Sequence, residues 1–295
     1  MVEVRLELAK EEAADAARGV ERGHDITPSK FLLQGLDLED QQYVFTLISR
    51  PCMHSDSVHR RVLQWDASRP KQTTLQAAEL QDKRNSLQRR IDTWRDVQDI
   101  YMPSARALRE TTSTTTTAPK HPETINLILP SAMTETIRES GCLQGLAMKE
   151  GRLRLAQADD ALRELRRQLR VSAQILDFKK HTVGGTSQRM ATKTQTLMLR
   201  FHNKTLRCAR RYSAAYNTLD ALHHPGDWRD RLRPLNHSAD LKLPGRDKEE
   251  DKKKKQVRES EGKREISWIW LAPRCDSERD GATGDEYGTG KPDTN

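Results

Sequence analysis

The stretch LRLAQADDALRELRRQLRVSAQILDFKK, residues 153–180, carries the most regular apolar pattern of the chain. Leucine recurs at every seventh position, and small or apolar residues occupy the positions between. These residues are Leu155, Leu162, Leu169 and Leu176, with Ala158, Leu165 and Ser172 between them. Residues spaced this way form one edge of an α-helix that packs against another helix. The stretch predicts a long helix over about 146–180, typical of a coiled coil, although an ordinary bundle helix shows the same pattern.

A second seam follows a pair of glycines. From about residue 187 to residue 223, apolar and small polar side chains recur in steps of three and four. They are Met190, Thr194, Leu197, Phe201, Thr205, Cys208, Tyr212, Ala215, Leu219 and Leu222. A short turn at Gly184 and Gly185 between two long helices favours an antiparallel hairpin.

A third long helix is expected over residues 73–102. Its stripe in steps of three and four consists of Ala77, Leu80, Arg84, Leu87, Ile91, Trp94, Gln98 and Tyr101. Trp94 and Tyr101 therefore share one side of the helix with apolar residues, which favours a packing stripe over a stacking platform for bases. Pro103 ends the helix, because proline lacks an N–H group and disfavours helix at the preceding residue.

The remaining segments connect or flank these helices. Residues 1–50 predict short helices, one over 2–18, one that stops at Gly35 and one capped by Asp37. Residues 125–224 hold the apolar run TINLILP, a small helix capped by Ser131 and the hairpin. We interpret residues 51–72 as a loop, residues 103–124 as a Thr-rich disordered linker and residues 225–265 as a charged linker. We expect residues 266–271 to form a Trp-containing strand or arm on the bundle, and residues 272–295 to form a disordered tail.

Composition supports this elongated architecture. Only 35% of the 295 residues are hydrophobic while 32% are charged, and the mean hydropathy is −0.86. So little apolar surface cannot bury most of the chain, which predicts a mainly α, elongated helical bundle with disordered linkers and a disordered C-terminal tail. Four widely spaced cysteines without a CxxC pair indicate a reducing compartment, and no apolar run is long enough for a membrane helix.

Positive charge is concentrated on the last long helix. Between residues 186 and 222, Asp220 is the sole acid, whereas the basic residues are Arg189, Lys193, Arg200, Lys204, Arg207, Arg210 and Arg211. At about 100° per residue, all of these except Arg210 fall within about 60° beside the apolar stripe. Such a ridge can contact DNA phosphates. Equally, it can be a solvated flank that pairs with Asp159, Asp160 and Glu164 of the neighbouring helix.

The sequence offers no convincing catalytic, metal or cofactor site. Cys52, His54 and His59 match no zinc spacing, and VGGTS at 183–187 is a turn rather than a phosphate loop. We expect His223 and His224 to favour the helix C-terminal dipole without a catalytic purpose. The net charge of +8 favours polyanions, and KKKK at 252–255 is either a nuclear import signal or part of a solvated linker.

Seven blocks, in order, resemble the C-terminal region of fungal Kyakuja–Dileera–Zisupton (KDZ) transposases. They are VRLELAKEEAADAARGV (4–20), GLDLEDQQ (35–42), LQDKRNSLQRRIDTWRDVQDIYMP (80–103), LILPSAM (127–133), LRLAQADDALRELRRQLRVSAQILDFKKH (153–181), TLRCARRYSAAYNTLDAL (205–222) and SEGKREISWIWL (260–271). Residues 181–198 depart from the more basic stretch of that family. The resemblance implies a transposon origin, and it implies that the ribonuclease-H-like catalytic domain lies upstream of the matching region. No catalytic residue is therefore carried over, and we expect no enzymatic activity.

Together these observations predict a non-catalytic, transposase-derived helical module that uses no cofactor. We expect an intracellular, nuclear protein that contacts DNA through Arg189, Lys193, Arg200, Lys204, Arg207 and Arg211. We also expect self-association, or contact with a parent transposase, through the seam Leu155–Leu176. A structural or protein-interaction module, or a decayed fragment without activity, is the alternative.

Overall fold

A computed structural model describes residues 1–19, 23–49, 74–113, 121–182, 188–241 and 267–273 of the protein. Our predictions for the 51–72 loop, the glycine turn, KKKK, the Cys52 cluster and residues 274–295 lie outside these residues. Within the described part every long element is a helix and there is no strand, so the mainly α bundle is confirmed.

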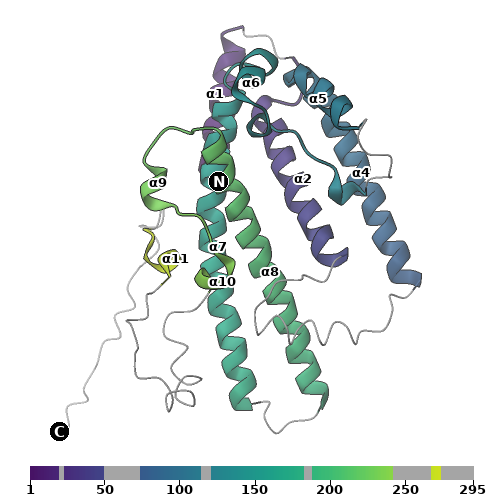
Figure 1. Ribbon diagram of the computed structural model, residues 1–295, viewed down its shortest axis with the longest axis vertical. Coiled ribbons are helices and arrows are strands. Elements are labelled where there is room, and N and C mark those ends of the chain that lie inside the picture. Colours follow the sequence, from purple (N-terminus) through teal and green to yellow (C-terminus); the bar gives the residue numbers. More distant parts are fainter. Residues whose placement is uncertain (20–22, 50–73, 114–120, 183–187, 242–266, 274–295) are drawn as a thin grey trace, which may run out of the picture.

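The elements follow the chain in a simple order. The longer helices are α1 (Val2–Ala17), α2 (Pro28–Ser49), α4 (Thr74–Tyr101), α5 (Pro103–Ser113), α7 (Leu146–Thr182) and α8 (Gln188–Ala221). The short elements are η1 (Pro122–Thr124), η2 (Pro130–Ala132), α6 (Glu135–Gly141), α9 (Trp228–Arg231), α10 (His237–Asp240) and α11 (Trp268–Leu271). In Figure 1, α2 and α4 lie on one side of the α7–α8 pair, and α9 and α11 lie on the other.

Helices α7 and α8 form the long antiparallel hairpin that their sequence pattern predicts (Figure 1). Leu162, Leu165 and Leu169 of α7 are buried in one apolar cluster with Tyr212 and Leu219 of α8. Over this stretch the leucine repeat is therefore used within the chain, and these leucines are not exposed to a second copy as we had expected.

Burial is weaker at both ends of the hairpin seam. Leu155, Leu176 and Phe201 are only partly buried, and Leu197 is 42% exposed. The regular spacing thus predicted which face of each helix packs. How deeply each residue of that face is buried depends on the other elements that cover the hairpin at that position.

Helix α4 packs its apolar stripe against α2. Leu87, Ile91, Trp94 and Tyr101 are buried, whereas Leu80, nearer the start of the helix, is only partly buried. The Trp94 ring stacks on Phe31 of α2 with 5.1 Å between centroids, and its Nε1 donates to the Phe31 carbonyl at 3.1 Å. Because this indole is buried by protein contacts, it offers no platform for a base.

Helix α2 is continuous, contrary to our expectation of two short helices separated at Gly35. A Cβ atom placed on Gly35 would lie 3.0 Å from the Trp94 ring and 3.0 Å from Leu129. Glycine is needed here because an indole and a leucine approach the helix backbone closely, not because the helix ends. Asp37 lies inside α2 and caps no helix.

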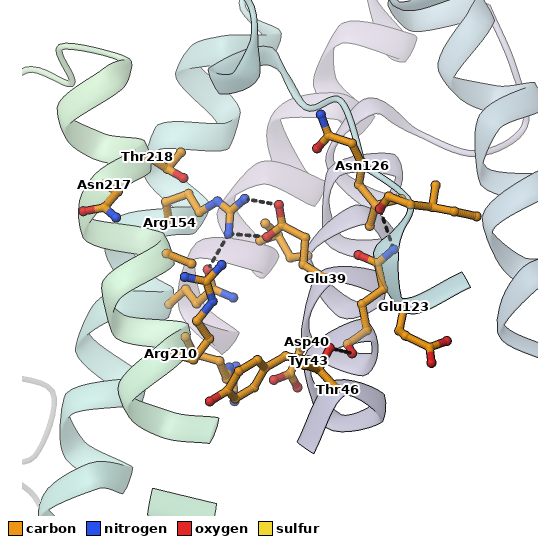
Figure 2. A pocket seen from close by; sticks show the side chains of 17 residues that line it. Glu39, Asp40, Tyr43, Thr46, Glu123, Asn126, Arg154, Arg210, Asn217 and Thr218 are labelled. Atoms are coloured by element: carbon orange, nitrogen blue, oxygen red, sulfur yellow. Dashed lines mark hydrogen bonds and ion pairs between the residues drawn. The ribbon is translucent and has the colours of Figure 1, made fainter. Parts of the chain in front are cut away.

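Helix α2 also meets the hairpin through ion pairs. Glu39 pairs with Arg154 of α7, with an Nη1–Oε2 distance of 2.7 Å (Figure 2), and Asp40 pairs with Arg207 of α8. These contacts place α2 along the upper half of α8 in Figure 1, while the lower half of the hairpin extends beyond the end of α2.

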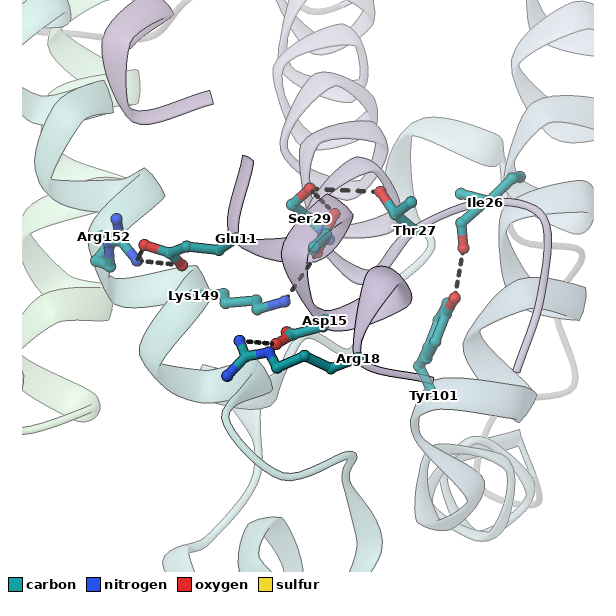
Figure 3. Close-up of polar contacts among 10 residues, drawn as sticks. Glu11, Asp15, Arg18, Ile26, Thr27, Ser29, Tyr101, Lys149 and Arg152 are labelled. Carbon is teal, nitrogen blue, oxygen red and sulfur yellow. Dashed lines mark hydrogen bonds and ion pairs between the residues drawn. The ribbon is translucent and has the colours of Figure 1, made fainter. Parts of the chain in front are cut away.

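A buried carboxylate joins α1, α2 and α7. Glu12 of α1 accepts from the Ser29 N–H at 2.8 Å and from the Ser29 hydroxyl at 2.7 Å, and Lys149 of α7 donates to it at 2.8 Å (Figure 3). Burial opposes the charge of Glu12, but these hydrogen bonds outweigh it and lower the pKa. The first turn of α2 is thus capped by a residue from another helix.

Two connecting segments are more ordered than their composition suggests. Residues Pro103–Ser113 form α5 rather than the beginning of the Thr-rich linker. Ser131 caps no helix, because α6 has Thr134 at its N-cap position and Ser131 instead donates its hydroxyl to Glu150 at 2.8 Å.

The segment after α8 is packed as well. Trp228 and Leu232 are buried against the hairpin, so this part of the expected 225–265 linker belongs to the core. Residues Trp268–Leu271 form one helical turn, not a strand, with Ile269 buried in the same cluster. Arg166 of α7 holds this turn by donating to the carbonyls of Ile269 and Ala272.

The tight contact at Gly35 gives a stability prediction. Gly35→Ala should lower the free energy of unfolding by about 1–3 kcal/mol, because the added methyl group forces buried neighbours apart. Helix propensity alone predicts the opposite sign, a gain of about 1 kcal/mol. Urea unfolding followed by circular dichroism measures the change, and a smaller loss in a Trp94→Leu background would locate the clash. A gain in stability would contradict the packing described for Gly35.

Candidate functional site

The basic residues of α8 fall into two groups along the helix. Lys193, Arg200 and Lys204 are exposed on the half that extends beyond α2. Among the described residues, Lys193 and Arg200 have no carboxylate partner. Lys204 lies over the Phe201 ring at 5.1 Å. Arg189 also lies in α8, but its side chain is outside the described residues.

Toward its C-terminal end, α8 faces α2. Arg207 donates to both carboxylate oxygens of Asp40, with Nε–O distances of 3.0 Å, and this hydrogen bonding raises the pKa of Arg207. The predicted ridge is therefore not one continuous surface, because α2 neutralises Arg207 and forms a pocket with the part of α8 beyond it.

The acids of α7 do not pair with the ridge in the way we considered. Asp159 pairs with Arg231, Asp160 with Arg163 and with the Met1 amine, and Glu164 with Arg167. Hydrogen bonds from Arg167 and Gln168 lower the pKa of Glu164, and the charge of Lys204 adds a smaller effect. The ion-pair alternative is wrong for Arg207, which pairs with α2 instead.

A polar pocket of about 390 Å³ lies between α2, α7, α8 and residues 123–127. In Figure 2, Arg154 of α7 contacts Glu39 of α2, and Arg210 of α8 and Tyr43 of α2 lie below this pair. Arg211, a ridge residue, also lines this pocket rather than the open surface.

A buried ionic network forms one wall of the pocket. Arg154 is 1% exposed and donates to both oxygens of Glu39 and to Gln157 at 3.1 Å. Its Nε lies 3.5 Å from Glu150, which is completely buried and accepts from the Ser131 N–H at 2.9 Å. The network joins α7 to α2 and to η2.

Burial and charge act in opposite directions on these groups. Burial opposes the charge of Arg154, but Glu39 and Glu150 outweigh it and raise the pKa of the guanidinium. Burial raises the pKa of Glu150, and Arg154 and Ser131 offset only part of this effect. Removal of Arg154 would therefore leave a carboxyl group that strongly favours its neutral form.

We did not predict this network from the sequence. Glu150, Arg154 and Gln157 recur in steps of four and three on α7, beside the leucine seam. The sequence signal for this network was a polar stripe at helical spacing, with an acid and an arginine four residues apart. Nothing in the sequence indicates that Glu39, 115 residues away from Arg154, completes it.

Burial disfavours the charged forms of two cysteines and one histidine in the described part of the chain. Burial raises the pKa of Cys208 to about 11 and also raises the pKa of Cys142, whose Sγ lies 3.6 Å from the Met133 Sδ. Burial lowers the pKa of His224, which disfavours the charged imidazole that we expected at the helix C-terminus. The described residues contain no cluster of His, Cys, Asp and Glu that could hold a metal ion.

Comparisons of the chain with protein-family models, curated proteins and solved structures found no match. The resemblance to KDZ transposases therefore stays a prediction. Among the described helices, none is both long enough and apolar enough to cross a membrane.

The buried network predicts a pH-dependent loss of stability in a variant. Arg154→Met should lower the free energy of unfolding at pH 7 by about 3–5 kcal/mol, because Glu150 is left buried without its cation. Glu150 already has a raised pKa in the wild type, so this loss is smallest at low pH, where the group is protonated in both proteins, and grows as the pH rises through that raised pKa. Denaturant unfolding at pH 5 and pH 7 measures the difference between variant and wild type.

The double variant Glu150→Gln/Arg154→Met is the matched control. It removes both charges and should be less sensitive to pH than Arg154→Met. An Arg154→Met deficit that is equal at both pH values would contradict the assignment of the loss to Glu150.

Proposed function

We propose that this chain is a transposon-derived, non-catalytic helical module that contacts nucleic-acid phosphates through the open half of α8. The observation that carries the proposal is the exposed basic group on that half, formed by Lys193, Arg200 and Lys204. Lys193 and Arg200 lack carboxylate partners among the described residues. Uncompensated lysine and arginine side chains on one face attract polyanions.

The spacing of these residues suits a phosphate backbone. Eleven positions separate Lys193 from Lys204, which corresponds to about 16 Å along the helix axis. About five base pairs of duplex occupy the same length at about 3.4 Å each. Three cations on that length favour contacts with several phosphates, and such contacts confer little sequence preference.

Other exposed arginines of the hairpin are less suited to this role. Arg163 and Arg167 of α7 pair with acids three residues away on the same helix. Arg170 lies over the Trp270 ring at 5.4 Å. The open half of α8 is therefore the better candidate for phosphate contact.

A protein-interaction module is the second candidate. Phe178 of α7 is 49% exposed and Leu197 of α8 is 42% exposed, both toward the end of the hairpin where α2 does not reach. Exposed apolar side chains of this kind support contact with a second copy or a parent transposase. Light scattering distinguishes this candidate: a discrete dimer that Phe178→Ser/Leu197→Ser converts to monomer would favour it.

The nucleic-acid proposal predicts a local loss of binding. Lys193→Glu/Arg200→Glu/Lys204→Glu should weaken binding to duplex DNA and make it less dependent on salt. The log–log slope of affinity against salt should fall by about 0.9 for each phosphate that the variant no longer neutralises. Fluorescence anisotropy with two unrelated duplexes, over a series of salt concentrations, measures both quantities. The two duplexes should bind with similar affinity.

A matched control separates local contact from total charge. Lys30→Glu/Lys83→Glu/Arg89→Glu reverses three exposed cations on α2 and α4 and changes the net charge equally. This control should bind with a salt slope close to that of the wild type. Equal losses of affinity in the two triple variants would contradict a specific role for α8.

A further inference from the structure

The pocket between α2, α7 and α8 is lined by three acids and three arginines, and two of these acids pair with arginines outside the lining. Three carboxylates line it, and each already has an arginine partner: Glu39 with Arg154, Asp40 with Arg207, and Glu123 with Arg84. Two further arginines of α8, Arg210 and Arg211, also line the pocket. No acid of the lining is left to pair with them.

No hydrogen bond or ion pair joins Arg210 or Arg211 to a described residue; Arg210 is exposed, and Arg211 is partly buried. The Arg211 Nε is buried and has no hydrogen-bond partner within that part of the chain. A buried donor without an acceptor is rare in folded proteins because it loses its hydrogen bonds to water. An anion in the pocket would supply the missing acceptor.

Short side chains of α8 keep the pocket open. Where α8 faces α2 beyond the two arginines, it presents Ala214, Asn217 and Thr218. Asn126 approaches from the opposite side, on the extended segment after η1 (Figure 2). Amide and hydroxyl groups at these positions can hydrogen-bond the oxygens of a ligand.

We propose that this pocket binds a phosphate group through Arg210 and Arg211. Guanidinium groups recognise phosphate by paired, charge-assisted hydrogen bonds, and two adjacent arginines provide several donors. The volume of about 390 Å³ exceeds the need of one phosphate and lies in the range of small-molecule sites. The phosphate belongs either to a small phosphorylated compound or to a nucleic-acid end.

This site is separate from the open half of α8, because Arg210 and Arg211 line the pocket that faces α2. The site therefore does not depend on the proposed contact with duplex backbone, and each can fail without the other.

Calorimetric titration of the full chain with inorganic pyrophosphate tests the proposal. We expect saturable binding, and we expect Arg210→Gln/Arg211→Gln to weaken it at least about tenfold, because charge-assisted hydrogen bonds are removed. Lys193→Gln/Arg200→Gln removes the same charge from the open half and should leave pyrophosphate affinity unchanged. Sodium chloride at equal ionic strength should produce no saturable signal.

A second variant keeps the test independent of the two arginines. Thr218→Met retains every charge but fills part of the pocket, and it should also weaken pyrophosphate binding at least about tenfold. Circular dichroism verifies that each variant is folded. Absence of saturable binding to the wild type, or wild-type affinity in either Arg210→Gln/Arg211→Gln or Thr218→Met, would overturn the proposal.

Two oligonucleotides identify the source of the phosphate. If the ligand is a nucleic-acid end, a 5′-phosphorylated oligonucleotide should compete with pyrophosphate, and the same oligonucleotide with a 5′-hydroxyl should not. If the ligand is a small phosphorylated compound, pyrophosphate should bind and neither oligonucleotide should compete with it. Equal competition by both oligonucleotides would contradict recognition of a terminal phosphate group.

Discussion

The arrangement of the helices depends on a guanidinium group that is buried between two carboxylates. Arg154 is inaccessible to solvent on α7 and can remain charged there only because Glu39 and Glu150 accept its hydrogen bonds. Glu150 in turn accepts from Ser131, which fixes the extended segment before α6. A buried charge has few acceptable arrangements, so we infer that this network favours one position of α2.

The position of α2 determines which charges of the hairpin remain available. By lying along one half of α8, α2 neutralises Arg207 through Asp40 and forms a polar pocket with Arg210 and Arg211 in its lining. The other half of α8 extends past α2 and keeps Lys193, Arg200 and Lys204 exposed. One basic helix thus presents two environments, an open surface and a pocket lined by Arg210 and Arg211, and we propose that the first contacts a phosphate backbone and the second binds a phosphate group.

Periodicity predicted the parts of the fold in which one face of a helix is continuously apolar. The seams through Leu162 and Leu165, and through Ile91 and Trp94, are buried as their spacing indicates. The prediction was wrong at Gly35, because the close approach of an indole to a helix backbone leaves no periodic signal in the sequence. It was also wrong about the charged segment near Trp228, where a few apolar residues suffice to fix a short turn on an existing surface.

The candidate sites were predictable only in part, for a related reason. Helical spacing placed Arg200, Lys204, Arg207 and Arg211 on one side of α8, but the division of that side depends on Asp40, 167 residues from Arg207. Pairing over such a distance in the chain is decided by tertiary packing, and no local pattern in this sequence indicates it.

Nuclear magnetic resonance of the arginine side chains tests the division of the basic helix most directly. In protein labelled with ¹⁵N-arginine, the Nε–Hε signals of Arg200, Arg210 and Arg211 are assigned from single Arg→Lys variants and followed as duplex DNA with 5′-hydroxyl ends is added. We predict that the Arg200 signal shifts while the signals of Arg210 and Arg211 stay in place. Shifts of Arg210 and Arg211 with an unchanged Arg200 would contradict the division of α8 into an open half and a half that lines the pocket.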